Sequence, residues 1–370
     1  APPTVNLLNR FGLTMYRLLR PLLFSMDAER AHSTGMRTAQ LVQKINPSMV
    51  EPLYEFERGL LRQKLWGLEF PNPIGLAAGF DKNAQLIPFW EKVGFGFVEV
   101  GSVSAQPSEG NARPRAFRVP ADEALINRMG LNNDGARAIA ERVRSTENER
   151  WRPLGINLVK THDPTLTGEA ALEDFRTSFS LLAPVADYIA LNISCPNTQD
   201  GKTFEDPEAL DDLLAVIFEE RRRLDLSVPI LIKLSPPHSD QVVFDSQLDE
   251  VIGVAQTHGV HGFIASNTAS DRSGMTASDD KLQQIGAGGM SGRPLARRST
   301  LLVRYLYQAT DGAIPIIGVG GVDSAETAYE KIRAGASLVQ LYTGLVYQGP
   351  GVVKSIKEEL VQLIARDNLS

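Results

Sequence analysis

The chain has 370 residues, of which 43% are hydrophobic and 22% are charged. This composition is typical of a globular protein and excludes a disordered, collagen-like or coiled-coil chain, and the length fits one large domain with an appendage or two medium domains. The net charge of −6 argues against a broad nucleic-acid-binding surface. Cys195 is the single cysteine and there are five histidines, so we expect neither an internal disulfide nor a metal site.

The first fifty residues differ in charge from the rest of the chain. They contain six Lys or Arg and two acidic residues, a net charge of +4, so the remaining residues carry −10. Apolar residues recur at steps of three and four from Leu7 to Met26, which predicts an amphipathic helix that Pro21 kinks or restarts. The sequence has no run of about 18 apolar residues, so a membrane-spanning helix is not expected. We therefore expect a soluble or peripheral intracellular protein.

A second helix is predicted to follow the first. Asp27 is a suitable N-cap, and Asn46-Pro47 would end the helix after about Ile45. Such a pair of helices, with one basic side and one side of Leu, Phe and Met, could lie on an anionic membrane surface or pack on the main domain. The pattern leaves both interpretations open, and the excess of apolar residues favours contact with a membrane or a lipid-like ligand.

From Trp66 onwards, short apolar runs alternate with longer amphipathic segments. Polar residues do not alternate with apolar ones inside the runs, which favours a parallel sheet buried on both faces. Eight such runs predict a (β/α)8 TIM barrel over residues 51–370, with residues 1–50 as an N-terminal helical extension; an open, doubly wound sheet is the alternative. The long intervals after Val100 and Ala265 predict inserted loops. The runs are Ile74–Ala78, Phe97–Val100, Gly155–Val159, Tyr188–Ile193, Ile230–Leu234, Gly262–Ala265, Ile314–Val319 and Leu338–Tyr342.

Polar residues stand at the ends of these runs. In a barrel, the carboxyl ends of all strands meet at one mouth, where active sites form. Fold stability does not require Asn, Lys and Thr at these places, so we interpret them as binding residues. The segments include AAGFDK (Ala77–Lys82), VGS (Val100–Ser102), NISCPNT (Asn192–Thr198), LIKLSP (Leu231–Pro236) and SNT (Ser266–Thr268).

The last two runs end in segments suited to a phosphorylated ligand. In GVGG (Gly318–Gly321) and YTG (Tyr342–Gly344), small residues let backbone N–H groups approach a phosphate, and Thr343 adds a hydroxyl donor. AAGFD, at the first strand end, would let a flat ring lie against the backbone. A glycine motif alone is equally consistent with a tight turn, but FMN satisfies both demands together.

Two further residue types indicate the chemistry. Lys233 lies inside an apolar run, so it should face a ligand or a partner, either as a cation beside a flavin or as a Schiff-base lysine. The clustered asparagines suit a substrate with amide edges, such as a pyrimidine or ureide, and Lys82 could hold its carboxylate. Cys195 is interpreted as a proton-transfer group, because a thiol with a reference pKa of about 8.5 permits base chemistry.

At these residues the chain resembles the dihydroorotate dehydrogenases, in particular their membrane-associated, quinone-using class. The resemblance covers essentially the whole chain, including the amino-terminal helices. It implies a (β/α)8 barrel with bound FMN that oxidises dihydroorotate to orotate in pyrimidine synthesis and passes the electrons to a membrane quinone. The segments that carry it are AAGFDKN, EGNARPRAFR (Glu109–Arg118), INRMG (Ile126–Gly130), NISCPNT, SNT, MSGRPL (Met290–Leu295), IIGVGGV and RAGASLVQLYTGL.

The resemblance also implies roles for individual residues. Cys195 would be the catalytic base, and His32 and Arg118 would line a quinone tunnel between the helices and the barrel. The residues that would bind FMN are Ala77, Ala78, Gly79, Ser102, Asn157, Asn192, Lys233, Ser266, Gly292, Gly321, Tyr342 and Thr343. The residues that would bind the substrate are Lys82, Asn127, Arg128, Met129, Gly130, Leu131, Asn197, Asn267 and Thr268.

Two residues depart from the family pattern. The quinone-using class normally has serine where Cys195 stands, whereas cysteine is usual in the soluble classes that reduce fumarate or NAD. Leu131 replaces a phenylalanine, which alters the packing on the substrate side. A soluble-class enzyme is therefore one alternative; a Schiff-base lyase barrel that uses Lys233 on a phosphorylated substrate and a non-catalytic membrane-binding scaffold are two others. The helices and Arg118 favour quinone.

The expected partners follow from this interpretation. They are dihydroorotate or orotate and a membrane quinone, with no nucleic acid. The N-terminal helices predict a peripheral position on a membrane surface. A bacterial inner membrane is the expected location, and the mitochondrial inner membrane is the alternative.

Overall fold

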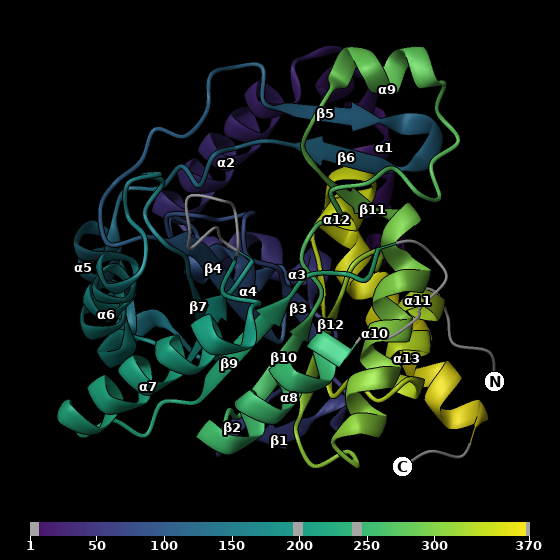
Figure 1. Ribbon diagram of the computed structural model, residues 1–370. Helices are drawn as coiled ribbons and strands as arrows, with labels where there is room; N and C mark the ends of the chain where they lie inside the picture. Colours follow the sequence, from purple (N-terminus) through teal and green to yellow (C-terminus); the bar gives the residue numbers. More distant parts are fainter. Residues whose placement is uncertain (1–6, 195–202, 239–245, 368–370) are drawn as a thin grey trace.

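The structure, a computed structural model, describes residues 7–194, 203–238 and 246–367 (Figure 1). Each of the eight predicted runs forms a strand, and the strands close a parallel barrel in the order β10-β12-β13-β3-β4-β7-β8-β9. The predicted closed barrel is confirmed, and the open-sheet alternative is wrong. The barrel strands are β3 (Ile74–Leu76), β4 (Phe97–Val103), β7 (Leu154–Leu158), β8 (Tyr188–Asn192), β9 (Ile230–Leu234), β10 (Gly262–Ala265), β12 (Ile316–Val319) and β13 (Leu338–Leu341).

Helices surround the barrel, and a short hairpin lies at the end opposite the mouth (Figure 1). The hairpin strands β1 (Gln63–Leu65) and β2 (Leu68–Phe70) bring Trp66 and Phe70 against the barrel interior. The helices are α3 (Glu51–Tyr54), α4 (Ile87–Lys92), α5 (Ala136–Ser145), α6 (Glu169–Leu182), α7 (Pro207–Arg223), α8 (Ser246–His258), α10 (Ala296–Ala309), α11 (Ala325–Arg333), α12 (Thr343–Gln348) and α13 (Gly351–Arg366).

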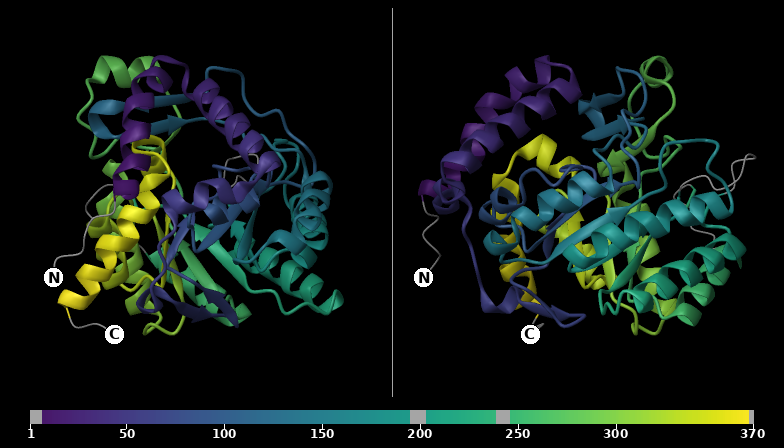
Figure 2. Two further views of the ribbon diagram at one scale, coloured as in Figure 1. Left: turned by 180° about the vertical axis from the view of Figure 1, so that it is seen from behind. Right: turned by 90° about the vertical axis from the view of Figure 1, so that its left-hand side faces the viewer.

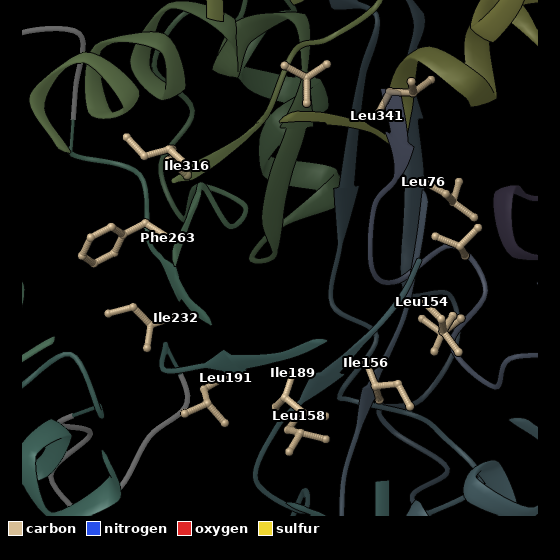
Figure 3. Close-up of a cluster of buried hydrophobic side chains, with 14 of the residues drawn as sticks. Leu76, Leu154, Ile156, Leu158, Ile189, Leu191, Ile232, Phe263, Ile316 and Leu341 are labelled. Atoms are coloured by element: carbon tan, nitrogen blue, oxygen red, sulfur yellow. The ribbon is translucent and has the colours of Figure 1, made fainter. Parts of the chain in front are cut away.

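The barrel strands are apolar throughout because both of their faces are buried. Along β8, Ile189 and Leu191 join the cluster between strands and helices, whereas Tyr188 and Ala190 join the cluster inside the barrel. Figure 3 shows members of the outer cluster, such as Ile156 on β7, arranged around the barrel. Successive side chains of a strand point to opposite faces, so a strand buried on both faces has no polar alternation.

The two predicted N-terminal helices are present as α1 (Leu7–Ser25) and α2 (Ala28–Ile45). Pro21 lies inside α1, which continues through it rather than restarting. The Asp27 carboxylate caps α2 as predicted, since it accepts hydrogen bonds of 3.0 Å from two backbone N–H groups of the first turn. In Figure 2 the helices lie beside the mouth, where α1 packs on α13 and α2 packs on α4 and β5.

The two long intervals contain insertions, as predicted, but these include paired strands and not only the predicted loops. β5 (Ala116–Val119) and β6 (Ala124–Asn127) come from the first interval, and β11 (Gly289–Gly292) comes from the second. They pair antiparallel in the order β11-β6-β5, and α9 (Asp279–Ile285) lies next to them above the barrel (Figure 1). The sequence predicted the insertions but not their pairing, which joins segments more than 160 residues apart.

Candidate active site

A cavity of about 370 Å³ opens at the carboxyl ends of the barrel strands. Most of the residues singled out from the sequence line it, which explains why polar residues follow strands that are far apart in the chain. Eleven of the predicted FMN ligands line it: Ala77, Ala78, Gly79, Ser102, Asn192, Lys233, Ser266, Gly292, Gly321, Tyr342 and Thr343. Seven of the predicted substrate ligands also line it: Lys82, Asn127, Met129, Gly130, Leu131, Asn267 and Thr268.

Two predicted residues lie outside the cavity lining, and two others cannot be compared. Asn157 is fully buried behind the cavity wall, where its side-chain oxygen accepts a hydrogen bond from Ser102. Arg128 does not line the cavity, because its guanidinium donates to the backbone carbonyls that precede and follow Gly286, at 2.6 and 2.9 Å. Cys195 and Asn197 lie outside the described residues.

One end of the cavity suits a phosphate. A Cβ on Gly321, which has φ +68°, would lie 2.4 Å from the Cβ of Ala296, so only glycine fits there. The Thr343 hydroxyl lies 2.9 Å from the Ser291 hydroxyl, and α12 begins at Thr343. Backbone at close quarters, free of side chains and flanked by hydroxyls, is the arrangement that phosphate groups bind.

Lys233 provides one cation in the lining of this cavity. It projects from β9, its side chain is buried, and its ammonium group has no hydrogen-bond partner among the described residues. Burial lowers the pKa of Lys233, and the negative charge of Glu99 opposes this effect. A buried ammonium without a protein partner fits a site that receives an anionic or electron-rich ligand group.

Amide and hydroxyl groups from the ends of β8 and β10 meet beside Lys233. The Asn267 amide donates to the Asn192 side-chain oxygen at 3.1 Å and to the Ser194 hydroxyl at 2.7 Å. The Ser194 hydroxyl also donates to the same Asn192 oxygen, at 2.8 Å. These groups offer the donors and acceptors that a ring with amide edges requires.

Lys82 provides a second cation in the lining of the cavity. Its ammonium donates to the side-chain oxygen of Asn132 at 2.7 Å. Burial, together with the charge of Arg115, lowers the pKa of Lys82 to about 8. The group is thus still protonated at neutral pH and can bind a carboxylate.

A second cavity of about 870 Å³ lies between the N-terminal helices and the barrel. It includes the predicted tunnel residues His32 and Arg118, together with residues of α1 and α2. The two cavities share a wall formed by Gly79, Lys82, Ala116, Leu125, Met129 and Tyr342.

His32 and Arg118 have different surroundings in this second cavity. The His32 ring contacts the edge of Phe80 with centroids 4.9 Å apart, and burial, helped by the charge of Lys82, lowers the pKa of His32 to about 4. His32 is therefore neutral across the physiological pH range. Arg118 donates to the backbone carbonyls of Leu23 and Met26, so it also holds the end of α1.

Comparison with known proteins is consistent with this geometry. Residues 60–364 match the family model described as dihydroorotate dehydrogenase. The chain belongs to the dihydroorotate dehydrogenase family. It is 41% identical to the dihydroorotate dehydrogenase (quinone) of Roseiflexus sp. (strain RS-1), with 96% of each chain covered, and 40% identical to the one of Natronomonas pharaonis, with 96% and 97% covered.

Solved structures of the dihydroorotate dehydrogenase family resemble the fold as well. The enzyme of Eimeria tenella in complex with ferulenol is 31% identical and superposes with a TM-score of 0.79 over 92% of both chains. Its ligand-free form is 32% identical and also has a TM-score of 0.79.

Sequence reasoning missed one central residue of this family member. Glu99 is fully buried on β4 and accepts hydrogen bonds from Asn157, Tyr188 and Gln340 at 2.8 to 3.1 Å. The signal was available, because a charged residue inside the apolar run FVEV is as unusual as Lys233 inside LIKL. Its partners come from three other strands, so the sequence pattern did not reveal them.

Proposed function

We propose that this protein binds FMN in the mouth cavity, oxidises dihydroorotate to orotate there, and passes the electrons to a quinone in the second cavity. The single observation that carries the proposal is the wall that the two cavities share. A ligand ring against Gly79 and Tyr342 would have the substrate residues on one side and the N-terminal helices on the other. The names of the relatives, which specify quinone, support the same assignment.

The residues of the mouth cavity fit both ligands. Lys233 would face the flavin ring and stabilise the negative charge that reduction places on it, while Gly321 and Thr343 would hold the phosphate. When bound, FMN supplies a hydride acceptor and a means of passing electrons onward. Lys82 would bind the carboxylate of dihydroorotate, and Asn267 would bind an amide edge of its ring.

The substrate must also lose a proton from the ring carbon that lies between a ring carbonyl and the carbon that bears the carboxylate. We assign this step to Cys195, whose thiol has a reference pKa of about 8.5 and whose thiolate is a competent base. Ser194, the described residue before it, lies at the cavity wall and bonds to Asn192 and Asn267. These contacts of Ser194 support the assignment.

The quinone would enter through the N-terminal helices, which we propose to rest on a membrane surface. Six large apolar side chains of this segment are exposed, up to 76% for Leu18: Leu18, Leu19, Leu22, Leu41, Ile45 and Met49. Exposed Arg17, Arg20 and Arg37 accompany them and would attract anionic lipids. None of the described helices has the length and apolar character that crossing a bilayer requires.

Anaerobic mixing tests this function in two stages. The purified protein should bleach its flavin absorbance when dihydroorotate is added. Quinone, fumarate and NAD are then supplied in parallel to the reduced protein, and quinone should restore the absorbance fastest.

Each alternative predicts a different result. Reoxidation by fumarate or NAD in preference to quinone would assign the protein to a soluble class. A colourless protein, trapped by borohydride at Lys233 in the presence of a phosphorylated substrate, would instead support the Schiff-base lyase.

A further inference from the structure

Glu99 connects to the mouth cavity through a series of side chains. Its Oε1 accepts from the Asn157 amide at 3.1 Å, and the Asn157 oxygen accepts from the Ser102 hydroxyl. The Ser102 oxygen in turn accepts from the Asn192 amide at 3.5 Å. The Asn192 oxygen accepts from Ser194 at 2.8 Å and from Asn267 at 3.1 Å. The series thus extends from the barrel centre to the substrate side of the cavity.

Every hydrogen bond in this series has the same direction. Each donor lies nearer the mouth and each acceptor lies nearer Glu99. An ionised carboxylate can only accept hydrogen bonds, whereas an asparagine can face a neighbour with either its NH₂ or its oxygen. The Glu99 carboxylate therefore fixes the orientation of the Asn157 amide, with its NH₂ towards Glu99 and its oxygen towards Ser102.

The rest of the barrel interior holds Glu99 in place. The Tyr188 hydroxyl and the Gln340 amide donate to Glu99 Oε2 at 2.9 and 2.8 Å. Gly155 makes this possible, because a Cβ there would lie 2.4 Å from the Tyr188 hydroxyl oxygen and 2.0 Å from the ring. Only glycine at position 155 leaves room for the Tyr188 hydroxyl to reach the Glu99 carboxylate.

We propose that Glu99 is a positioning residue that orients the amides and hydroxyls of the cofactor and substrate cavity through a one-way chain of hydrogen bonds. The residues of this chain are Glu99, Asn157, Ser102, Asn192, Ser194 and Asn267. The inference rests on the proposed function for the identity of the ligand, FMN, but not for the chain itself. It also assigns a role to Asn157, which lies behind the cavity wall.

The test moves the carboxylate from Glu99 to the next member of the hydrogen-bonded chain, Asn157. Asn157→Asp places two carboxylates face to face and should weaken FMN binding by the apoprotein at least about tenfold, the value of a hydrogen bond to a charged group. In the double variant Asn157→Asp/Glu99→Gln, the new amide donates to the new carboxylate and its oxygen accepts from Tyr188 and Gln340. The two carboxylates then no longer face each other and Ser102 keeps its acceptor, so FMN affinity should return to within about threefold of the parent, a difference smaller than the value of one hydrogen bond.

Glu91→Gln is the matched control. Glu91 is also buried and accepts hydrogen bonds from two backbone N–H groups, but it lies on α4, away from the mouth cavity. Asn157→Asp/Glu91→Gln should remain as weak in FMN binding as Asn157→Asp alone. Equal FMN affinities of the two double variants would overturn the proposal.

Thermal unfolding of the four apoproteins provides an independent readout. The midpoint should fall in Asn157→Asp, recover with Glu99→Gln, and not recover with Glu91→Gln. A parent protein that binds no FMN would refute the proposed function, and the order of the unfolding midpoints would still decide whether the chain exists. If Asn157→Asp does not fold, rescue of folding by Glu99→Gln but not by Glu91→Gln supports the chain, and failure of both refutes it.

Discussion

The two adjoining cavities are built in different ways. The mouth cavity is formed by strand ends whose backbones are fixed by the closed barrel, and its polar groups are bonded to one another. The second cavity exists because side chains attach two helices to the barrel. Arg118 holds the end of α1, the buried Arg115 pairs with Glu29 of α2 at 2.8 Å, and Tyr16 donates to the carbonyl of Val346.

Because the two cavities are built differently, the two half-reactions of the proposed function, reduction by dihydroorotate and reoxidation by quinone, should be separable. Backbone ladders of a closed barrel resist local change, because each strand is bonded on both sides. Contacts made by a few side chains can be removed singly. Variants in the helices should therefore alter reoxidation by quinone alone, and variants at the mouth should alter reduction by dihydroorotate.

Deletion of residues 1–50 should have the largest effect. It removes one wall of the second cavity, so reoxidation by long-tailed quinones should fall to the background rate, whereas flavin reduction by dihydroorotate should stay near the parent rate. Stopped-flow measurement of each half-reaction checks this, with flavin content as the control for folding. Full-rate turnover of such quinones by the truncated protein would contradict the assignment.

Cys195→Ala should reverse that pattern. The loss of a positioned base should slow flavin reduction by about 10²–10⁴-fold and leave quinone reoxidation unchanged. Cys195→Ser should retain part of the rate and shift the rise of the reduction rate to higher pH, because a hydroxyl ionises far less readily than a thiol. A Cys195→Ala rate within a few-fold of the parent, with an unchanged pH dependence, would place the base elsewhere.

Lys233→Ala tests the cation of the mouth cavity. Removal of a fixed charge next to a developing anion in a water-poor site should weaken FMN binding and slow flavin reduction by roughly 10–100-fold. Lys92→Ala, at a half-buried ion pair with Glu51 outside the site, is the control. Titration of the apoproteins with FMN measures the first effect, and a fully active, yellow Lys233→Ala protein would refute the role.

The smallest effect is expected at the ion pair that attaches α2. Burial alone would raise the pKa of Glu29, but hydrogen bonds and charges from Arg115 and Arg113 outweigh it and lower the pKa below its usual 4.5. The stability that Glu29 contributes is thus present above about pH 4.5 and is lost as the pH falls through the lowered value. Glu29→Gln should cost about 1–3 kcal/mol and remove this dependence.

Hydrogen exchange between pH 3 and 7 checks the last prediction. In the parent, amides of α2 should lose protection below about pH 4.5, before those of the barrel strands do. In Glu29→Gln they should exchange faster than in the parent near neutral pH, and this difference should shrink towards pH 3. An α2 that is equally protected at pH 3 and 7 would show that the ion pair does not hold the helix.

Much of the mouth cavity could be predicted because its residues follow strand ends. Lys233, Asn267 and Thr343 each stand where an apolar run stops or is interrupted, and parallel strands bring such places to one mouth. Arg128 shows the limit of this reasoning. It belongs to a motif whose neighbours line the cavity, yet its guanidinium reaches carbonyls next to α9, a partner set by the pairing of β6 with β11.

The sequence by itself determined the eight strands, the two N-terminal helices and their boundaries, because burial on two faces and helix capping leave local patterns. Tertiary structure alone decided that β11 pairs with β6, that the helices enclose a cavity against the barrel, and that Glu99 ends a hydrogen-bonded chain. Each of these depends on groups that lie far apart in the chain and meet only after the barrel has closed. A residue pattern within one segment therefore does not predict such partners.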